Sequence, residues 1–560
     1  MTKDKPIEQT GNHLISSFFH YVPKDISVLP TAKDHRAHEN NDSLNDFDQA
    51  VQLSLKLTME RCCPVCNETM TLMTREFELH INECLDKNVS ISPIGSLTGL
   101  DQVDDLELTQ ELSHTSLDTA AAAAPTTSSE SDVRTSTVAL PRSKTTKKPI
   151  PGYKWLKDTR FVVDAFSYGA IPGCHGYFLT HFHSDHYGGL KKSWVHGPIY
   201  CSKVTANLVQ SQLQVGREYL HVLPLDKVTA LSDTVKVSLI DANHCPGSVL
   251  FVFDVLRRQD GESTWVRHVH TGDFRANPKM CLHPLLCQNS NPPIDHLYLD
   301  TTYLQAKYSF PAQEECIDAV TKVVQGYLCG PPSIPSLLDQ WIKRTPSLPM
   351  QNDQRQSKLL VVVGAYTIGK EKVFYAIANA LQSKIFVTEQ KLRVLLCQEN
   401  PDLENLLTTD QSEAQVHVLP LNDIKAENMH AYLKSLAPRF GILFAFKPTG
   451  WAFKASQSLT AEMEVGSLAL VTQPPKERQV DLNLSYSSNQ VKIYGVPYSE
   501  HSSFRELASF IASLNIQHII PTVPSSSEKT QTMMEYYLEK WQREKPSAIE
   551  IVPYPTESHW

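Results

Sequence analysis

Apolar residues follow two spacings along the chain from about residue 151 onward. Short runs rich in β-branched and aromatic residues, bounded by Gly, Pro or Asp, are typical of buried strands. They are RFVVDAF (160–166), GYFLTHF (176–182), PIYCS (198–202), KVSLIDA (236–242), SVLFVFDV (248–255) and HLYLDTTY (296–303). Helical spacing follows in KVTANLVQSQL (203–213) and QEECIDAVTKVVQGYL (313–328). The mixture predicts an α/β layered fold in which helices cover sheets.

The same alternation stops and starts again, which predicts one domain inserted into another. A Pro/Ser-rich stretch interrupts the pattern between about residues 330 and 357. A second α/β pattern follows in KLLVVVGAY, EKVFYAIANAL, SKIFVT and AQVHVLP, and QVKIYGVPYSEHSS and QHIIPTV then resume the first pattern. We therefore expect a first domain in two parts, 151–330 and 481–560, with the inserted domain at 331–480.

The N-terminal region has a different composition. Residues 1–60 are polar with two short amphipathic pieces, and residues 61–88 hold a Cys/His cluster. Residues 89–150 are rich in Ser, Thr and Asp and cannot bury enough apolar surface to fold, so we expect a disordered linker. Its end, RSKTTKKP (142–149), is basic and has two interpretations, a solvated linker or a nuclear-import signal.

Composition and charge narrow the class of protein. A length of 560 residues suggests several domains, and 41% hydrophobic residues is ordinary for a globular protein. No apolar run approaches the roughly 20 residues that span a bilayer, and the N-terminus lacks a secretory signal, so we expect an intracellular protein with no membrane partner. The net charge of −9 divides into −8 for residues 1–150 (14 Lys/Arg, 22 Asp/Glu) and −1 for the rest (38 and 39). A near-neutral folded part is compatible with a basic groove for nucleic acid.

The strongest chemical signal is HFHSDH, directly after the predicted strand GYFLT. His181 and His183 can point at one ion, and Asp185 and His186 at a second. Imidazole and carboxylate are ligands expected for zinc. Other His and Asp residues follow predicted strands, namely Asp164, His244, Asp273, Asp300 and His501. Each alone is more typical of a capping aspartate or a structural histidine, but together they supply ligands for two ions.

These motifs resemble a known family. HFHSDH, with VVDAF before it and NHCPGS and TGDFR after it, is similar to the metallo-β-lactamase superfamily. LDTTY, YSEHSS and IIPTV resemble the three β-CASP motifs of its nucleic-acid-processing branch. Longer stretches, among them VDAFSYGAIPGCHGYFLTHFHSDHYGGL, VVVGAYTIGKEKVF and FAFKPTGW, resemble the DNA cross-link repair exonucleases related to Artemis and Apollo over residues 150–545.

The resemblance implies a four-layer αββα metallo-β-lactamase fold with an inserted α/β β-CASP domain. It implies one zinc held by His181, His183, His244 and a bridging Asp273, and a second zinc, of less certain occupancy, held by Asp185, His186, Asp273 and His501. Asp164 would orient a ligand histidine, and Asp300 would support His186 or the second metal. The residues expected to carry catalysis are Asp185, His186, Asp273, Asp300 and His501.

The implied activity is zinc-dependent 5′→3′ hydrolysis of DNA phosphodiester bonds in interstrand cross-link repair, in the nucleus. Val523 in IIPTV stands where RNA-processing relatives usually carry histidine, which favours DNA, although Pro524 departs from the common PTVN pattern. Two alternatives stay open: an RNA-processing β-CASP endonuclease, and a catalytically dead scaffold that binds ubiquitin and the sliding clamp.

Several residues are candidates for binding a DNA phosphate at a 5′ end. In VVVGAYTIGKE, a Gly-rich turn and Lys370 precede a predicted helix, where backbone N–H groups favour phosphate. The segment fits GxxxxGK, but Glu371 replaces the Ser or Thr of a P-loop, which excludes ATP binding. We expect Tyr366, Lys370 and Lys447 to contact phosphate, with Thr302 and Tyr303 lining the pocket. For Lys370 the alternative is a helix cap whose side chain is merely solvated. For Trp451, which lies near Lys447 and could stack on a base, the alternative is structural packing.

The N-terminal region carries three further motifs. Cys63, Cys66, His80 and Cys84 have zinc-finger spacing, and CPVCNETM…FELHINECL resembles ubiquitin-binding zinc fingers of DNA-repair proteins. DFDQAVQLSL (46–55) resembles a ubiquitin-interacting helix, although an amphipathic helix without a fixed partner is the alternative. Residues 12–19, NHLISSFF, resemble a box that binds the sliding clamp PCNA, with Asn12 in place of the usual Gln.

Overall fold

The fold is described from a computed structural model that covers the chain in segments. They are residues 59–62, 69–72, 149–287, 292–329, 358–453, 466–474, 480–524, 527–545 and 549–560. In the first two segments the backbone forms an antiparallel pair, β1 (Met59–Cys62) with β2 (Thr69–Leu72). The motifs predicted at residues 12–19 and 46–55 lie outside the described residues.

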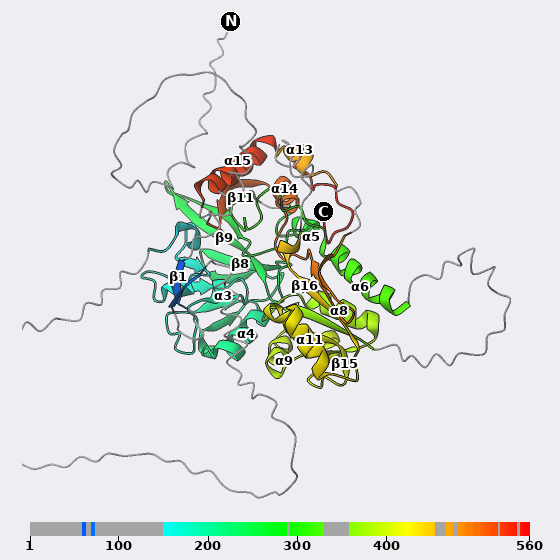
Figure 1. The fold of residues 1–560 in the computed structure, drawn as a ribbon. Coiled ribbons are helices and arrows are strands. Elements are labelled where there is room, and N and C mark those ends of the chain that lie inside the picture. The colour runs from blue at the N-terminus through cyan, green and yellow to red at the C-terminus, as the bar shows by residue number, and fades with distance from the viewer. Residues whose placement is uncertain are drawn as a thin grey trace, which may run out of the picture. The chain divides into compact units, whose positions relative to one another are not determined.

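Two sheets form a sandwich, which we call the first part of the fold (Figure 1). A four-stranded parallel sheet contains β3 (Phe161–Val163), β4 (Gly176–Phe178), β5 (Ile199–Cys201) and β6 (Leu220–Val222). A six-stranded sheet has the order β19 (Ile516–Pro521), β11 (Ile294–Leu299), β10 (Glu262–His270), β9 (Val249–Gln259), β8 (Val235–Asp241), β7 (Thr229–Ser232). In the six-stranded sheet β10, β11 and β19 are parallel, and the strands from β10 to β7 are antiparallel.

The two sheets pack face to face through a layer of apolar side chains. Phe178 on β4 makes edge-to-face contacts with Phe251 and Phe253 on β9, with ring centroids 5.0 and 4.9 Å apart. Such aromatic pairs add to the stabilisation that buried area provides. The sandwich therefore has one continuous core between its sheets, as alternating inward-facing positions predict.

Helices cover the outer faces of both sheets. The helix α4 (Lys203–Leu213) packs on the four-stranded sheet through Leu208 and Val209. The six-stranded sheet is covered by α5 (Pro278–Leu282), α13 (Leu468–Val471), α14 (Phe504–Ala512) and α15 (Glu528–Glu544). The layers run helix, sheet, sheet, helix, which confirms the predicted αββα architecture. Within the described segments, no helix is long and apolar enough to cross a bilayer.

A seven-stranded sheet forms the inserted α/β part. Its order is β14 (Leu407–Thr408), β13 (Lys384–Phe386), β15 (Ala414–Pro420), β12 (Leu359–Ala365), β16 (Ile442–Pro448), β18 (Val491–Val496), β17 (Asn483–Ser487). Only β17 is antiparallel to its neighbour. One face packs against α6 (Gln313–Cys329), α8 (Glu371–Leu381), α9 (Glu389–Leu396) and α10 (Pro401–Glu404), and the other against α11 (Ala426–Ser435). Every residue of β12 is buried, because helices cover both faces of this parallel sheet.

The packing moves the boundaries of the inserted part. Cys316, Val320 and Val324 of α6 belong to the core of the seven-stranded sheet, so this part begins near residue 313 rather than 331. QVKIYGV, which we expected to resume the first pattern, is β18 of the inserted sheet, so the return follows Val496 rather than residue 480. Between β16 and β17 the chain also returns to the sandwich, where α13 packs beside α14 and α15. Period-2 patterning identifies a strand but not the sheet that it joins.

The remaining elements of the described segments are short. They are α3 (Ser184–Tyr187) and the 3-10 turns η2 (Gly152–Lys154), η3 (Phe166–Tyr168), η4 (Arg217–Tyr219), η6 (Leu421–Asp423) and η7 (Gly450–Ala452).

Candidate metal centre and adjoining pocket

The site is assembled from loops that leave the carboxyl ends of strands. Asp164 follows β3, the HFHSDH segment follows β4, His244 follows β8, Asp273 follows β10 and Asp300 follows β11. His501 comes from the inserted sheet, in the loop between β18 and α14. Ligand sites in open α/β sheets form at this edge, because the strand ends bring side chains from distant sequence positions together.

The segment HFHSDH changes from extended backbone to helix within its own length. His183 has an extended conformation (φ −109°, ψ 150°) and is the N-cap of α3, whose first turn contains Asp185. This change turns His183 toward His181 and leaves Asp185 and His186 on the short helix. That the two pairs of side chains hold two different ions stays a prediction.

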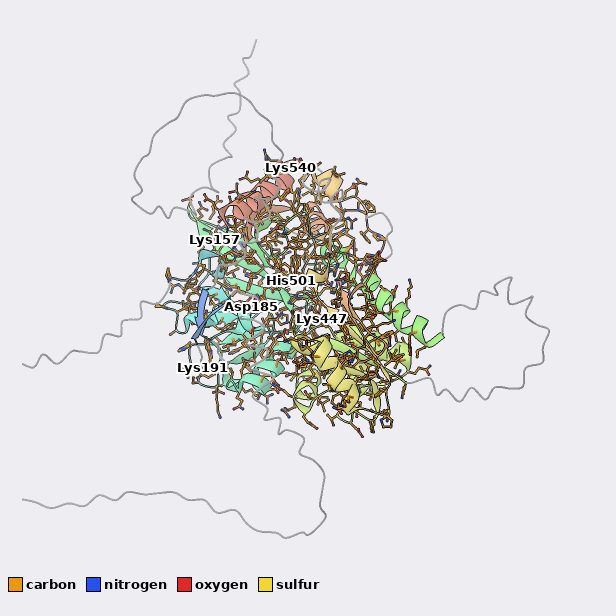
Figure 2. All side chains as sticks on the ribbon, viewed as in Figure 1. Lys157, Asp185, Lys191, Lys447, His501 and Lys540 are labelled. Carbon is orange, nitrogen blue, oxygen red and sulfur yellow. The ribbon has the colours of Figure 1, made fainter. Side chains whose placement is uncertain are left out.

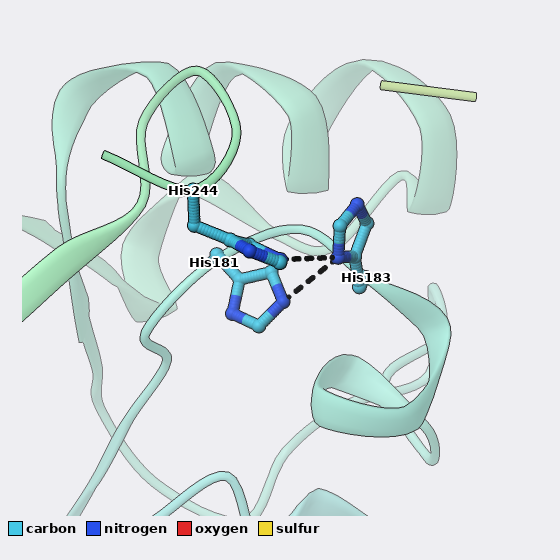
Figure 3. A group of neighbouring side chains, drawn as sticks. All are labelled: His181, His183 and His244. Carbon is cyan, nitrogen blue, oxygen red and sulfur yellow. Dashed lines mark hydrogen bonds between the residues drawn. The ribbon is translucent and has the colours of Figure 1, made fainter. Parts of the chain in front are cut away.

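Three imidazoles converge in the first group, as Figure 3 shows. Nε2 of His181 lies 2.9 Å from Nδ1 of His183, and Nε2 of His244 lies 3.0 Å from the same atom. Contacts with groups outside this cluster place the ring protons on the nitrogens that point away from it. Nδ1 of His244 donates to the backbone carbonyl of Glu500 (2.8 Å), and Nε2 of His183 faces the carbonyl of Ile368 (3.4 Å).

The hydroxyl of Thr180 completes this assignment for His181. It donates to Asp164 Oδ2 (2.8 Å), so it accepts from Nδ1 of His181 at 3.0 Å. The three nitrogens that face one another therefore carry lone pairs and no proton. Lone pairs at about 3 Å repel unless a cation lies between them, so the donor set fits a metal ion.

A second group is centred on one carboxylate oxygen. Oδ2 of Asp273 lies 3.3 Å from Nε2 of His186 and 3.8 Å from Nε2 of both His181 and His501. It is also 3.9 Å from Nε2 of His244. One oxygen among four imidazoles is the position of a ligand shared by two ions.

Two buried aspartates orient the histidines of the second group. Asp164 Oδ2 accepts from Nδ1 of His186 at 2.7 Å, and Asp300 Oδ2 accepts from Nδ1 of His501 at 2.8 Å. Each bond leaves Nε2 of the ring free to face Asp273. Asp300 therefore supports His501 and not His186, which has Asp164 as its partner. Such outer carboxylates set the tautomer of a ligand histidine.

Burial and neighbouring charge divide the histidines into two electrostatic classes. Burial and the neighbouring imidazoles lower the pKa of His181 and His244 well below the usual value. For His501, burial acts downward, but Asp300 and Asp273 outweigh it and raise the pKa to about 9. The pKa of His186 is likewise raised well above its usual value, because Asp273, Asp185 and Asp164 outweigh burial. In the ion-free site the second group therefore holds protons where a metal would bind.

Asp185 is the most solvent-accessible carboxylate of the site. Its side chain is 35% exposed, and Oδ2 lies 3.4 Å from Nε2 of His186. Burial acts to raise the pKa of Asp185, but the charge and hydrogen bond of His186 outweigh it and lower the pKa. The residue is thus an ionised acceptor at the open side of the cluster.

Thr180 and Gly272 are functional positions that motif analysis did not single out. The Thr180 backbone N–H and hydroxyl donate to the two oxygens of Asp164, at 2.9 and 2.8 Å. Gly272 has φ +55°, and a Cβ there would lie 2.6 Å from Thr180 Cβ. Only glycine allows this approach, which brings the Asp273 loop against the strand carrying the histidines. Both residues stand in the quoted motifs, Thr180 in LTHFHSDH and Gly272 in TGDFR. Their contact forms only in the folded protein, so the sequence alone does not indicate it.

A pocket of about 310 Å³ adjoins the cluster. Its lining is Tyr366, Leu421, Asn422, Lys447, Thr449, Trp451 and Ala452. Tyr303 connects the two, since its ring centroid lies 5.8 Å from that of His501 and 5.7 Å from that of Trp451. Asp185, His501 and Lys447 are labelled across the central part of Figure 2.

The residues predicted to contact phosphate divide into two sets. Tyr366 and Lys447 line the pocket, and Trp451, although it packs edge-on against Tyr303, is 51% exposed. Thr302 caps the turn after β11, where its N–H and hydroxyl donate to Asp300 Oδ1 at 2.9 and 2.6 Å. Its hydroxyl therefore stabilises the loop rather than facing the pocket.

Lys370 occupies a different environment from the one expected. It is 5% exposed, and its ammonium forms a buried ion pair with Glu500, whose Oε1 also accepts from the Lys370 backbone N–H at 2.8 Å. The cause is the left-handed backbone of Lys370 (φ 70°) just before α8, which turns the side chain inward. In this structure Lys370 ties the inserted part to the loop that carries His501, and its contact with a DNA phosphate stays a prediction.

The other predicted residues have simple placements. Val523 follows β19 and is half-buried, and the N–H of the preceding Thr522 donates to the carbonyl of Leu299 at 2.9 Å, beside Asp300. Cys63, Cys66, His80 and Cys84 lie outside the described residues.

Known proteins share this chain's sequence over most of its length. The family described as DNA repair metallo-beta-lactamase matches residues 401–527. The DNA cross-link repair protein pso2/snm1 of Schizosaccharomyces pombe is 36% identical over 486 residues, 86% of this chain and 78% of that protein. The DNA cross-link repair protein SNM1 of Arabidopsis thaliana is 39% identical over 401 residues, 72% of each chain. The 5′ exonuclease Apollo of Danio rerio is 27% identical over 404 residues, 71% of this chain and 56% of Apollo.

The expected resemblance is confirmed, because the similarity extends through both sheets of the sandwich and through the inserted part. The chain belongs to the DNA cross-link repair family of the metallo-β-lactamase fold.

Proposed function

We propose that this protein is a zinc-dependent 5′→3′ exodeoxyribonuclease that hydrolyses phosphodiester bonds in DNA interstrand cross-link repair. The observation that carries the proposal is the convergence of three unprotonated imidazole nitrogens beside a carboxylate oxygen placed among four imidazoles. The names of the relatives, DNA cross-link repair proteins and a 5′ exonuclease, supply the reaction that such a centre serves.

The donor chemistry favours zinc over harder cations. Imidazole nitrogens dominate the set, whereas magnesium and calcium prefer oxygen ligands. One ion would be held by His181, His183, His244 and Asp273, and a second by Asp185, His186, Asp273 and His501. When bound, the ions supply Lewis acidity, which generates a nucleophile from water near neutral pH and stabilises charge on the phosphate.

The protein's own groups orient the reaction. Asp185, ionised and 35% exposed, is placed to accept a proton from the attacking water at the open side of the cluster. Asp164 and Asp300 hold His186 and His501 in the tautomer that keeps Nε2 available. These roles need no Ser or Cys nucleophile.

The pocket beside Tyr303 is where we place the DNA end. Lys447 and Tyr366 would contact the 5′ phosphate, and the exposed ring of Trp451 offers a surface on which a base can stack. Val523, at the position where RNA-processing relatives usually carry histidine, favours DNA over RNA. Exonucleolytic polarity would follow, because a pocket for a terminal phosphate anchors the 5′ end.

The N-terminal motifs are proposed to recruit the enzyme. Cys63, Cys66, His80 and Cys84 would hold a structural zinc in a finger that binds ubiquitin, and NHLISSFF (12–19) would bind the sliding clamp, including ubiquitinated PCNA. We place the protein in the nucleus, because its relatives are named as DNA repair proteins. Pull-down of ubiquitin and PCNA by residues 1–90, compared with Cys66→Ala and Phe18→Ala forms, tests this recruitment.

The deciding experiment is hydrolysis of end-labelled single-stranded DNA. The substrates carry a 5′ phosphate or a 5′ hydroxyl, with a matched RNA, and the enzymes are wild type, Asp185→Ala and the exposed control Asp402→Ala. We expect stepwise cleavage from the phosphorylated 5′ end by wild type and the control, and loss of cleavage in Asp185→Ala. Preference for RNA, or no cleavage by the zinc-loaded wild type, would overturn the proposal.

A further inference from the structure

A second group of histidines lies away from the proposed catalytic centre, on the three neighbouring parallel strands β10, β11 and β19, of which β10 and β11 also lead to Asp273 and Asp300. The strand register places His268 on β10 opposite His296 on β11, and His296 opposite His518 on β19. The row precedes Asp300 by four residues on β11, which at ~3.3 Å per residue is roughly 13 Å along the strand. The two groups therefore share strands but not side chains.

His268 is a buried polar side chain without a partner. It is 0% exposed, and neither ring nitrogen forms a hydrogen bond. The nearest acidic oxygens are Oδ2 of Asp295, 3.8 Å from Nδ1, and Oδ2 of Asp158, 3.7 Å from Nε2. Leaving a polar group buried and unsatisfied costs on the order of 1–3 kcal/mol, so a ligand for this ring would remove a real penalty.

We propose that His268, Asp295 and His296 form a structural binding site for a divalent transition-metal ion of the zinc type. One donor atom from each residue lies within 4.8 Å of the others. Tetrahedral ligands at ~2.0–2.1 Å from an ion are about 3.3 Å apart. The distance from His268 Nδ1 to Asp295 Oδ2 is 3.8 Å, and that from His296 Nδ1 to the same oxygen is 2.6 Å. The two distances lie on either side of the required value, so small side-chain rotations suffice.

The group also contains cations. Asp158 and Asp295 supply two carboxylates, and Arg257 supplies one guanidinium, which contacts both of them. Burial lowers the pKa of His296, and the ammonium of Lys157 acts in the same direction, so the two carboxylates lie among two cations. Nε2 of His268 lies 3.7 Å from Oδ2 of Asp158, on the side where metal-bound histidines usually have an outer carboxylate.

A fourth donor is available at the open side of the group. The ring of His518 is exposed, and its centroid lies 5.0 Å from that of His296. An ion held here would link β10 and β11 directly and reach β19 through His518. The site would thus fasten the parallel half of the six-stranded sheet, upstream of the loops that carry Asp273 and Asp300.

The test is the metal content of the full chain after zinc loading and removal of excess metal. Wild type is compared with His296→Gln and with His221→Gln, a control at an exposed histidine on β6. We expect His296→Gln to bind one zinc fewer per chain and to unfold at a lower temperature, and His221→Gln to keep the wild-type content. Equal zinc content in wild type and His296→Gln would overturn the proposal.

Crystals of the zinc-loaded wild type give an answer that does not depend on any variant folding. Anomalous scattering at the zinc edge is expected to show a peak between His268 and His296, separate from any peak at Asp273. Peaks at the Asp273 cluster alone would refute the structural site and leave the proposed nuclease intact. A peak at His268 without one at Asp273 would support the structural site and contradict the proposed function.

Discussion

Replacing Asp164 by Asn tests how the tautomer of His186 controls the metal centre. The position has φ 50°, a left-handed conformation that Asn tolerates, so the backbone has no reason to move. Oδ1 of Asp164 accepts from the Thr180 N–H, and Oδ2 accepts from the Thr180 hydroxyl and from His186. In the variant the amide oxygen is retained by the Thr180 N–H, so the NH₂ group faces Nδ1 of His186.

The consequence is a forced exchange of tautomers. An NH₂ group cannot accept from Nδ1–H, so the ring of His186 gives up the Nδ1 proton and keeps the proton on Nε2, the atom that faces Asp273 at 3.3 Å. That nitrogen can then no longer bind a metal. Outer contacts of this kind change metal affinity by about 10–100-fold, or roughly 1.4–2.8 kcal/mol. We expect the second metal equivalent to bind that much more weakly, while the first is unchanged.

Calorimetric titration of the metal-free enzyme with zinc measures both equivalents. The matched control is Asp226→Asn, which makes the same substitution at φ 57° beside His283, at 3.1 Å, on an exposed loop. The control should bind like wild type. If Asp164→Asn binds both equivalents within twofold of wild type, the assignment of the His186 proton is wrong.

Three further predictions follow from the site. Glu500→Gln leaves the buried ammonium of Lys370 unpaired and should lower the free energy of unfolding by about 3–5 kcal/mol. Urea denaturation measures this change, and an unchanged free energy of unfolding would show that the ion pair is solvated. Metal binding at pH 7 should release about two protons, because the pKa of His501 is raised to about 9 and that of His186 is raised well above normal. The affinity of the site for zinc should therefore rise with pH up to about 9. Titrations in buffers of different ionisation enthalpy measure the release, and a value near zero would contradict these pKa shifts. Trp451→Ala should weaken the binding of single-stranded DNA by ~1–3 kcal/mol without lowering the melting temperature, because the ring is half exposed. Fluorescence anisotropy in EDTA, which prevents turnover, measures this binding, and an unchanged affinity would exclude base stacking on Trp451.

The sequence predicted the layered fold because the patterns that specify it are local. Buried strands such as SVLFVFDV can be recognised from their composition. Likewise, HFHSDH places four candidate ligands in one short loop. The domain boundaries were less accessible, because α6 and β18 look like any amphipathic helix and any buried strand. Their sheet is decided by long-range packing, which α13 shows most clearly by returning to the first core between β16 and β17.

Side-chain roles divide in the same way. The types of residue at the site could be read from motifs, but the individual partners could not: the motifs left open whether Asp300 supports His186 or the second metal, and the structure shows its contact with His501. The buried ion pair of Lys370 with Glu500 could not be read from GxxxxGK, because it depends on a left-handed backbone at Lys370 and on a partner 130 residues away. The histidine row of β10, β11 and β19 was missed because its members are far apart in sequence and only register brings them together.

The crossing from β18 to α14 couples metal affinity to the arrangement of the two sheet systems. His181, His183 and His244 all belong to the sandwich, whereas His501 lies on the segment that arrives from the inserted sheet. Both ion positions therefore depend on the inserted part. The first depends on it through the carbonyls of Ile368 and Glu500, which face His183 and His244, and the second depends on it through His501 itself. By reciprocity, a bound ion favours the docked arrangement by the same free energy that docking contributes to its binding, so loss of metal would weaken the contact between the two sheet systems.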